Sequence, residues 1–161
     1  ITTPVQKGFA ALLLGHSPQL PLLPHATASL FQERHYLSGP QTLRYFKKGA
    51  LMLFYESTKN GGSGAIVAIA RVREAYHKPT ASLDMSDFKR SVLNAESLRS
   101  IGRSEIKTVT VFDNAFSLPH HISLETLKRI GCGRPNDLIT TRPITDNQLQ
   151  SILREAFGYA Q

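Results

Sequence analysis

The fold is decided by the stretch Lys47-Lys48-Gly49-Ala50-Leu51-Met52-Leu53-Phe54-Tyr55-Glu56-Ser57, in which two lysines and a glycine lead into an apolar, aromatic run. The glycine-rich segment 58–64 follows with the composition of a loop, and residues 65–72 form a second apolar run. Two such runs separated by glycines are typical of a β-hairpin. The sequence therefore predicts a strand, a tight turn and a second strand at the centre of the fold.

The second predicted strand changes character along its length. Alternation places Val67, Ile69, Arg71 and Arg73 on one face, and the even-numbered residues from 66 to 72 on the other. Both faces begin apolar, and the first becomes basic toward its end. A buried strand that becomes charged in this way reaches a cleft or the rim of a barrel, so we expect its end to line a functional surface.

The segments before the hairpin read as helices and a connector. Residues 3–15 have a threonine cap, a proline in the first turn and apolar residues at helical spacing. Residues 26–36 also look helical, and two prolines predict an extended connector at 20–24. We therefore assign residues 1–41 to N-terminal helices and a connector that pack on a main domain formed by residues 42–161.

Beyond the hairpin, short strands and helices alternate irregularly. The expected elements are a turn at 77–80, a helix at 95–101, a strand at 107–112 that Asp113-Asn114 ends, a helix at 124–130, a strand at 138–141 and a last helix from residue 146. Ser123 and Thr145 are the predicted caps of the last two helices. A short helix or strand is expected at 42–46. This order has no βαβ rhythm and predicts an α+β fold, a small, mostly antiparallel β-barrel decorated with short helices.

The composition bounds the class of protein. The 161 residues are 41% hydrophobic and 19% charged, which fits one folded domain. No apolar run is long enough to cross a bilayer, and the single cysteine, Cys132, fits a reducing compartment, so we expect a cytoplasmic protein. A formal charge of +7 favours RNA or DNA as the partner. Because the chain begins at Ile1 rather than Met, we expect that a further domain precedes it.

Several blocks of the chain, in order, resemble the EVE and ASCH domains of the PUA-like superfamily. Residues 48–57 are similar to their strand of a basic residue, Gly, apolar residues and Phe-Tyr-x-Ser. Residues 64–72 look like the strand that follows, and Glu74-Ala75-Tyr76 with Pro79-Thr80 resembles the block after it. Together with the C-terminal blocks, the resemblance covers residues 42–157.

The C-terminal half resembles PUA-like domains that are fused to acetyltransferase or nuclease domains in prokaryotes. The blocks concerned are residues 109–114, 124–127 and 136–140. The resemblance implies a PUA-like pseudobarrel that binds RNA, or DNA and RNA with modified bases, and a fused or associated acetyltransferase or nuclease domain. It also implies an aromatic-walled pocket for a flipped base. The chain has no tryptophan, so any such cage must use Tyr45, Tyr55, Tyr76, Phe112 or Phe116. The hairpin thus favours a nucleic-acid-binding wall over a reader of methylated bases.

Two positions offer contacts to a base. Tyr55 and Ser57 share a strand face, so a ring and a hydroxyl together would hold a base. The alternative is a core tyrosine and a serine that caps the turn. Asn114 offers a donor and an acceptor to a base edge, and the alternative is a turn made with Asp113. We expect a cleft between the hairpin and the strand end at 112–114.

Basic side chains gather around the hairpin. The candidate phosphate contacts are Lys47, Lys48, Lys59, Arg71, Arg73, Lys78 and Arg103. Each alone reads as a solvated surface charge, and their clustering indicates a polyanion site. Tyr55, Ser57, Tyr76, Phe112 and Asn114 complete the candidate nucleic-acid-binding set.

The sequence has no metal or cofactor signature. Its histidines lack metal-ligand spacing, and neither a Gly-x-Ser-x-Gly elbow nor a P-loop is present, so we expect no cofactor, no metal and no catalysis. Two alternatives stay open. One is a regulatory or protein-interaction module of a larger protein. The other is an amidohydrolase on acetylated cytidine, which the ASCH resemblance implies and for which Lys48, Thr58 and Glu56 are the nearest residues.

Overall fold

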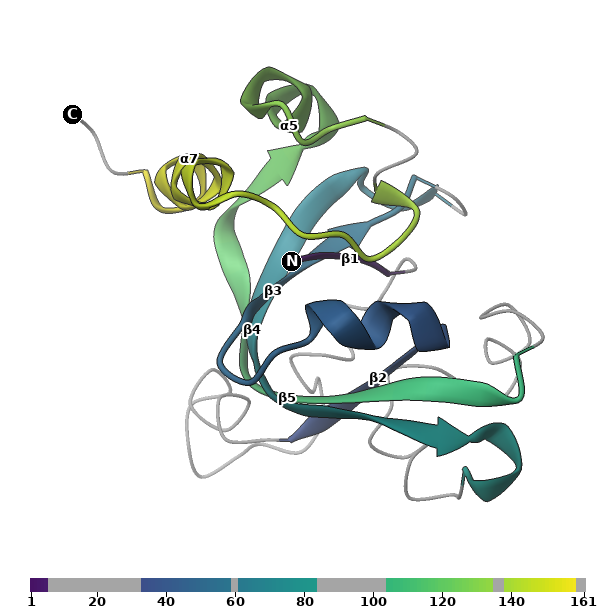
Figure 1. Cartoon of the computed structure of the whole chain (residues 1–161). Coiled ribbons are helices and arrows are strands. Elements are labelled where there is room, and N and C mark those ends of the chain that lie inside the picture. The colour runs from purple at the N-terminus through teal and green to yellow at the C-terminus, as the bar shows by residue number, and fades with distance from the viewer. Residues whose placement is uncertain (6–32, 59–60, 84–103, 135–137, 159–161) are drawn as a thin grey trace, which may run out of the picture.

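The computed structural model of the chain describes residues 1–5, 33–58, 61–83, 104–134 and 138–158. Its strands form one sheet in the order β1-β3-β4-β5-β2, and only the β1–β3 pairing is parallel. The strands are β1 (Thr2–Val5), β2 (Arg34–Ser38), β3 (Leu51–Glu56), β4 (Ala65–Pro79) and β5 (Ile106–Ser123). The helices, seen in Figure 1, are η1 (Pro40–Tyr45), η3 (Thr80–Ser82), α5 (Leu124–Ile130) and α7 (Asp146–Phe157).

The central hairpin is confirmed. β3 and β4 pair antiparallel from Leu51 opposite Arg71 to Glu56 opposite Ala65. In the loop between them, Gly61 and Gly64 have φ angles of 76° and 63°, which glycine adopts without steric cost. The Glu56 carboxylate accepts the Ser63 backbone N–H at 2.8 Å. The described part of the glycine-rich segment therefore belongs to a loop, in which the Glu56 side chain at the end of the first strand binds the backbone just before the second.

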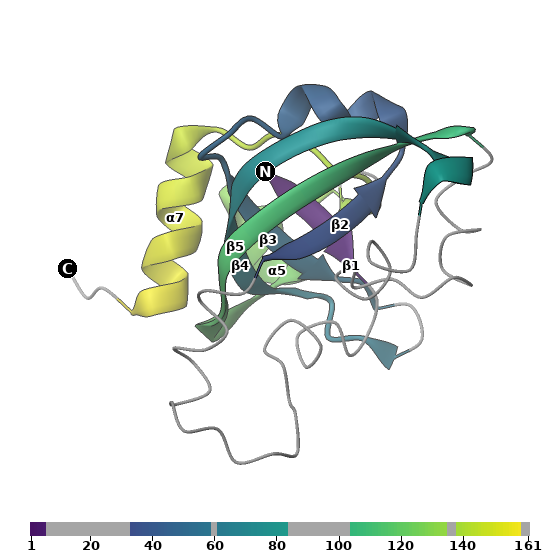
Figure 2. The same ribbon diagram turned by 90° about the horizontal axis from the view of Figure 1, so that it is seen from below.

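The sheet bends, and different layers cover its two faces. On the concave face, a core that includes Met52, Phe54 and Phe112 lies beneath η1, which contacts β4 and β5 (Figure 1). On the convex face, α5 and α7 cover a second core that includes Ile69 and Ile152. Figure 2 shows α7 lying outside the bend of β4 and β5. We call these the concave core and the convex core.

The bent sheet makes an approximate barrel that is not closed by strand pairing. Its edge strands, β1 and β2, face one another in Figure 2. A side chain links them, because the Tyr36 hydroxyl on β2 donates to the Pro4 carbonyl on β1 at 3.1 Å. The Tyr36 ring is buried against Phe46, and burial raises the pKa of Tyr36. The predicted α+β class and mostly antiparallel arrangement are confirmed.

The two predicted N-terminal helices are wrong where the structure describes them, because residues 2–5 and 34–38 are strands. Thr2 exchanges backbone hydrogen bonds of 2.9 and 3.1 Å with Arg142 on the outer side of β1. Pro4, two residues further, faces the same outer side, so its missing N–H leaves the ladder with β3 intact. Residues 34–38 are strand because they pair with β5, a long-range contact that overrides helical spacing. The remainder of both helices and the connector lie outside the described residues.

β4 and β5 are both longer than predicted. The turn expected at 77–80 is wrong, since β4 continues to Pro79 and η3 follows. β5 does not end at Asn114, because this residue takes a φ of 50° in a bulge and the strand continues beyond it. A further register shift between Ile66 and Ala68 puts Val67 in the concave core and Ile66 in the convex core, the reverse of the predicted faces.

The last two helix starts are confirmed. The Ser123 hydroxyl accepts the Thr126 N–H at 3.2 Å, and Thr145 forms a capping box with Gln148. The short element expected at 42–46 is part of η1. The strand predicted at 138–141 is wrong, because Leu138 packs into the convex core and no strand forms there. The helix expected at 95–101 lies outside the described residues. None of the described helices is long and apolar enough to cross a membrane.

Candidate nucleic-acid interface

The basic turn before β3 lies against the middle of β4. Gly49 donates its N–H to the Val72 carbonyl at 2.8 Å, and the Val72 N–H donates to the Ala50 carbonyl at 2.9 Å. Gly49 has a φ of 84°, a left-handed conformation that favours glycine. Lys47 and Lys48 are exposed in this turn. The backbone therefore brings both lysines beside the residues that flank Val72.

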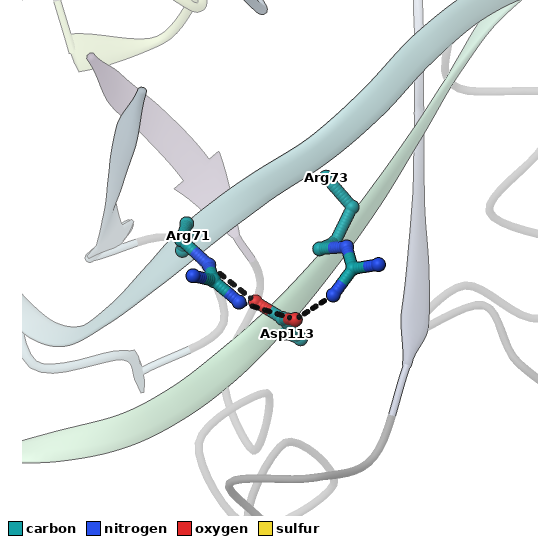
Figure 3. Close-up of polar contacts among 3 residues, drawn as sticks. All are labelled: Arg71, Arg73 and Asp113. Carbon is teal, nitrogen blue, oxygen red and sulfur yellow. Dashed lines mark hydrogen bonds and ion pairs between the residues drawn. The ribbon is translucent and has the colours of Figure 1, made fainter. Parts of the chain in front are cut away.

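Two arginines reach from β4 to one carboxylate on β5 (Figure 3). Arg71 donates from Nε to Asp113 Oδ1 at 3.0 Å and from Nη2 to Oδ2 at 2.9 Å. Arg73 donates from Nη1 to Oδ2 at 3.1 Å. Arg71 stands opposite Asp113 in the ladder, and the register shift between Val72 and Glu74 makes Arg73 an extra residue on β4. Pairing and bulge together gather both guanidinium groups around the carboxylate.

In this ion-paired group, the two arginines face solvent and the aspartate lies behind them. The Asp113 side chain is 9% exposed, whereas those of Arg71 and Arg73 are 45% and 48% exposed. The hydrogen bond from Arg71 holds the pKa of Asp113 below its ordinary value, against the effect of desolvation, and Arg73 adds to this. The same hydrogen bond raises the pKa of Arg71. Two arginines paired with one buried aspartate give the group a net positive charge, and the arginines are the part of it that solvent reaches.

Asn114 follows Asp113 at the bulge of β5. It is half-buried, and its φ of 50° is a conformation that few residues other than glycine and asparagine tolerate. Its side-chain amide makes no hydrogen bond to a described residue, so a donor and an acceptor remain for a ligand. The pairing of the turn with β4, and of β4 with β5, thus places five predicted site residues on neighbouring backbone segments: Lys47, Lys48, Arg71, Arg73 and Asn114.

Three of the rings predicted to hold a base lie in the two cores. Phe112 is fully buried on the concave face, with its ring centroid 5.3 Å from that of Phe54. Tyr55 is buried in the convex core, and burial raises its pKa. Phe116 packs against the ring of Phe157 on α7 at 6.2 Å. Tyr55 and Phe112 are therefore core rings, while the partly buried Phe116 packs against the convex core.

The other predicted contacts are spread over the molecule. The Arg44 guanidinium lies 4.7 Å from the centre of the Tyr45 ring and also donates to its hydroxyl. Tyr76, 37% exposed, is five residues beyond Arg71 on β4, which is about 16 Å along a strand. Ser57 comes directly after β3, at the end of that strand away from the basic turn. Lys78 lies next to the last residue of β4, well beyond Arg71. Lys59 and Arg103 lie outside the described residues.

β3 separates the three residues considered for an amidohydrolase. Lys48 precedes this strand, while Glu56 and Thr58 lie at its other end. A strand of six residues spans about 20 Å, so the three side chains do not form one site. In the part of the chain that the structure describes, no three His, Cys, Asp or Glu side chains gather as metal ligands.

Asp113 is the member of the site that the sequence does not reveal. The sequence predicts a turn at this position, and the structure shows a buried carboxylate in mid-strand. Opposite charges at paired positions of two strands are the signal that identifies such a residue. This signal requires the register, and the β4–β5 ladder contains three register shifts that the sequence does not announce.

Comparison with known proteins agrees with this architecture. A family model of the EVE domain matches residues 23–155. The structure of an ASCH variant from Zymomonas mobilis, with one tyrosine changed to phenylalanine, has a TM-score of 0.67 at 10% identity and covers 94% of both chains. Another ASCH structure from that organism has a TM-score of 0.62 at 13% identity, covering 94% of this chain and 92% of the other.

A crystal structure of a Pseudomonas putida protein is also similar. Its TM-score is 0.52 at 21% identity, and the match covers 78% of this chain and 86% of that one. At these identities, the solved structures show a shared fold alone. No curated protein matches the chain.

Proposed function

The chain belongs to the EVE domain family, and on that premise we propose that it is a nucleic-acid-binding module. The binding surface is the basic face, which we define as Lys47, Lys48, Arg71 and Arg73. The observation that carries the proposal is the meeting of the lysine turn and the arginine pair at the middle of β4. Phosphates of RNA or DNA are the groups that such a face binds.

The charge of the basic face supports a polyanionic ligand. Four cationic side chains outnumber the Asp113 carboxylate that pairs with two of them and the exposed Glu74 beside Arg73, within a chain of formal charge +7. Arginine suits this role because its planar guanidinium donates two parallel hydrogen bonds to one phosphate. Each phosphate that is neutralised releases counterions, so binding of this kind weakens steeply with salt.

Asn114 gives the basic face a group that can read a base. Its amide offers both a donor and an acceptor, the combination that matches an adenine edge. Because the rings of Tyr55 and Phe112 are buried, the phosphate backbone supplies most of the proposed affinity and stacking supplies little.

Fluorescence anisotropy tests the proposal with labelled mixed-sequence RNA, single-stranded DNA and duplex DNA of equal length. We expect binding that weakens linearly on a plot of log affinity against log salt concentration. The Lys47→Ala, Lys48→Ala double variant should lower the slope of that plot by roughly 0.7–0.9 for each lysine that contacts a phosphate. Arg129→Ala, on α5 beyond the end of β5, is the control and should change the slope little. Absence of binding to all three ligands, or binding that ignores salt, would sink the proposal.

Other expectations from the sequence stay predictions beside this one. They are a cytoplasmic location, a fused or associated acetyltransferase or nuclease domain, and the absence of catalysis. The two alternative functions, a regulatory or protein-interaction module of a larger protein and an amidohydrolase on acetylated cytidine, also stay predictions. Release of acetate from acetylated cytidine, measured on the same preparations, separates an enzyme from a binding module.

A further inference from the structure

The two arginines of the basic face differ in how Asp113 occupies them (Figure 3). Arg71 gives its Nε–Nη2 edge to the two carboxylate oxygens, at 3.0 and 2.9 Å. Arg73 gives only Nη1, at 3.1 Å, and its own Nε–Nη2 edge makes no hydrogen bond to a described residue. That edge is a fork that fits two oxygens of one phosphate. The Nε–Nη2 edge of Arg71 is therefore bound to the carboxylate, while the same edge of Arg73 is available to a ligand.

We infer that Asp113 is a positioning residue that holds Arg73 so that the free edge of its guanidinium meets one phosphodiester of a bound RNA or DNA. The inference rests on the proposed function, because it assigns a phosphate to the basic face. A different role for Asp113 would be purely structural, as a clamp between β4 and β5 at their bulges. The two roles predict different effects on binding.

The exposures of the three side chains fit the positioning role. At 9% exposure, the Asp113 side chain lies behind the two guanidinium groups, which are 45% and 48% exposed. A phosphate that approaches from solvent therefore meets Arg73 before the carboxylate. An arginine that is already held in one orientation also loses less rotamer freedom when it binds. Asp113 thus supports binding although its own charge repels a phosphate.

The direction in which Asp113→Asn changes nucleic-acid affinity in the full chain distinguishes the two roles. The substitution removes a negative charge, so Coulomb attraction alone predicts tighter binding to a polyanion. Positioning predicts the reverse, a weakening of about tenfold for a labelled mixed-sequence single-stranded RNA or DNA at low salt, because Arg73 loses its anchor. A lower thermal unfolding temperature is expected under both roles, but a purely structural role leaves the affinity of the folded protein unchanged. Affinity equal to or tighter than that of the wild type overturns the inference and leaves the proposed function standing.

Arg73→Lys tests the same point and keeps both the net charge and the Arg71–Asp113 contact. It replaces the fork by a point charge, so we expect binding that is weaker by about tenfold with an unchanged salt slope. Arg129→Lys is the matched control and should bind as the wild type does. Wild-type affinity for Arg73→Lys overturns the inference. If the wild type itself binds no nucleic acid, the proposed function fails first, and the inference fails with it.

Discussion

The two halves of β4 carry opposite kinds of surface on one continuous strand. In the half from Ala65 to Ala70, which we call the covered half, every residue is buried between the concave core and the convex core. In the half from Arg71 to Pro79, which we call the open half, most residues are exposed or partly exposed. The backbone is strand throughout, so the difference arises from the side chains, which are apolar up to Ala70 and largely polar after it, and from the helices that cover the convex face of the first half. The candidate site begins where this cover ends.

The same comparison applies to the forces that hold each half to β5. The covered half is held by apolar contacts beneath α5 and α7, including those of Ile69 and Ile152. The open half has an ion pair of Arg71 and Arg73 with Asp113 on the same face. Apolar burial is strong and is not screened by salt, whereas half-exposed ion pairs are weaker, are screened by salt, depend on pH and leave their charges available to a ligand. Substitutions should therefore separate stability from binding along one strand.

The largest effect is expected from Ile152→Ala on α7, in the convex core that covers the first half of β4. Ile152 is fully buried in the convex core, and its truncation leaves a cavity that α7 does not fill. We expect a loss of about 2–5 kcal/mol in the free energy of unfolding, measured by urea denaturation. Ile152→Val is the graded control, at about 0.5–1.5 kcal/mol. Nucleic-acid affinity of the folded variant should equal that of the wild type, and a change in affinity would break the division between the halves.

A smaller loss is expected in the open half, from Asp113→Asn. Hydrogen bonds to a charged group contribute about 1.5–3 kcal/mol, and the half-exposed arginines reduce this to about 1–2 kcal/mol near neutral pH. The folded protein lowers the pKa of Asp113 from its ordinary value of 3.8, so the unfolded state binds the proton more readily. The stabilisation is therefore complete above that ordinary value and is lost as the pH falls through the lowered pKa of the folded state.

Urea denaturation of the wild type and Asp113→Asn over a series of acidic pH values checks this dependence. Other carboxylates titrate in the same range, but they cancel in the difference between the two proteins. The difference should be largest near neutral pH and should shrink as the pH falls. A difference that stays constant would mean that the Asp113 charge does not stabilise the open half.

The sequence predicts the parts of this contrast that depend on neighbouring residues. The hairpin, the basic end of its second strand and the caps at Ser123 and Thr145 follow from local patterns, and the structure confirms them. β1 and β2 do not follow, because a strand of four or five residues gains its stability from pairing with distant strands. Local helix signals at Thr3 and near Tyr36 therefore mislead.

The candidate site is predictable to a similar extent. The cations of the basic face come together because a hairpin and the turn before it place them there, and sequence spacing shows this. The burial of Tyr55 and Phe112 is not predictable in the same way, since an aromatic residue in a strand fits a core and a cleft equally well. Asp113 is hidden for a further reason, because its pairing with Arg71 depends on bulges that sequence alternation does not contain.

The smallest effect is expected from a second ion pair that joins helix to helix. Arg129 on α5 donates to Glu155 on α7 at 2.9 Å, and both side chains are exposed, at 69% and 47%. Exposed pairs of this kind contribute about 0–1 kcal/mol, because water screens them and two long side chains lose rotamer freedom. Arg129→Ala should therefore change urea stability by less than Asp113→Asn does, although the two donor distances are alike. Because the bond lengths match, a smaller effect would exclude bond length as the source and leave the burial of Asp113 and its three hydrogen bonds. If Arg129→Ala lowers the free energy of unfolding as much as Asp113→Asn does, the buried position of Asp113 adds no stability beyond that of an exposed ion pair. The contrast between the two halves of β4 would then come from apolar packing alone.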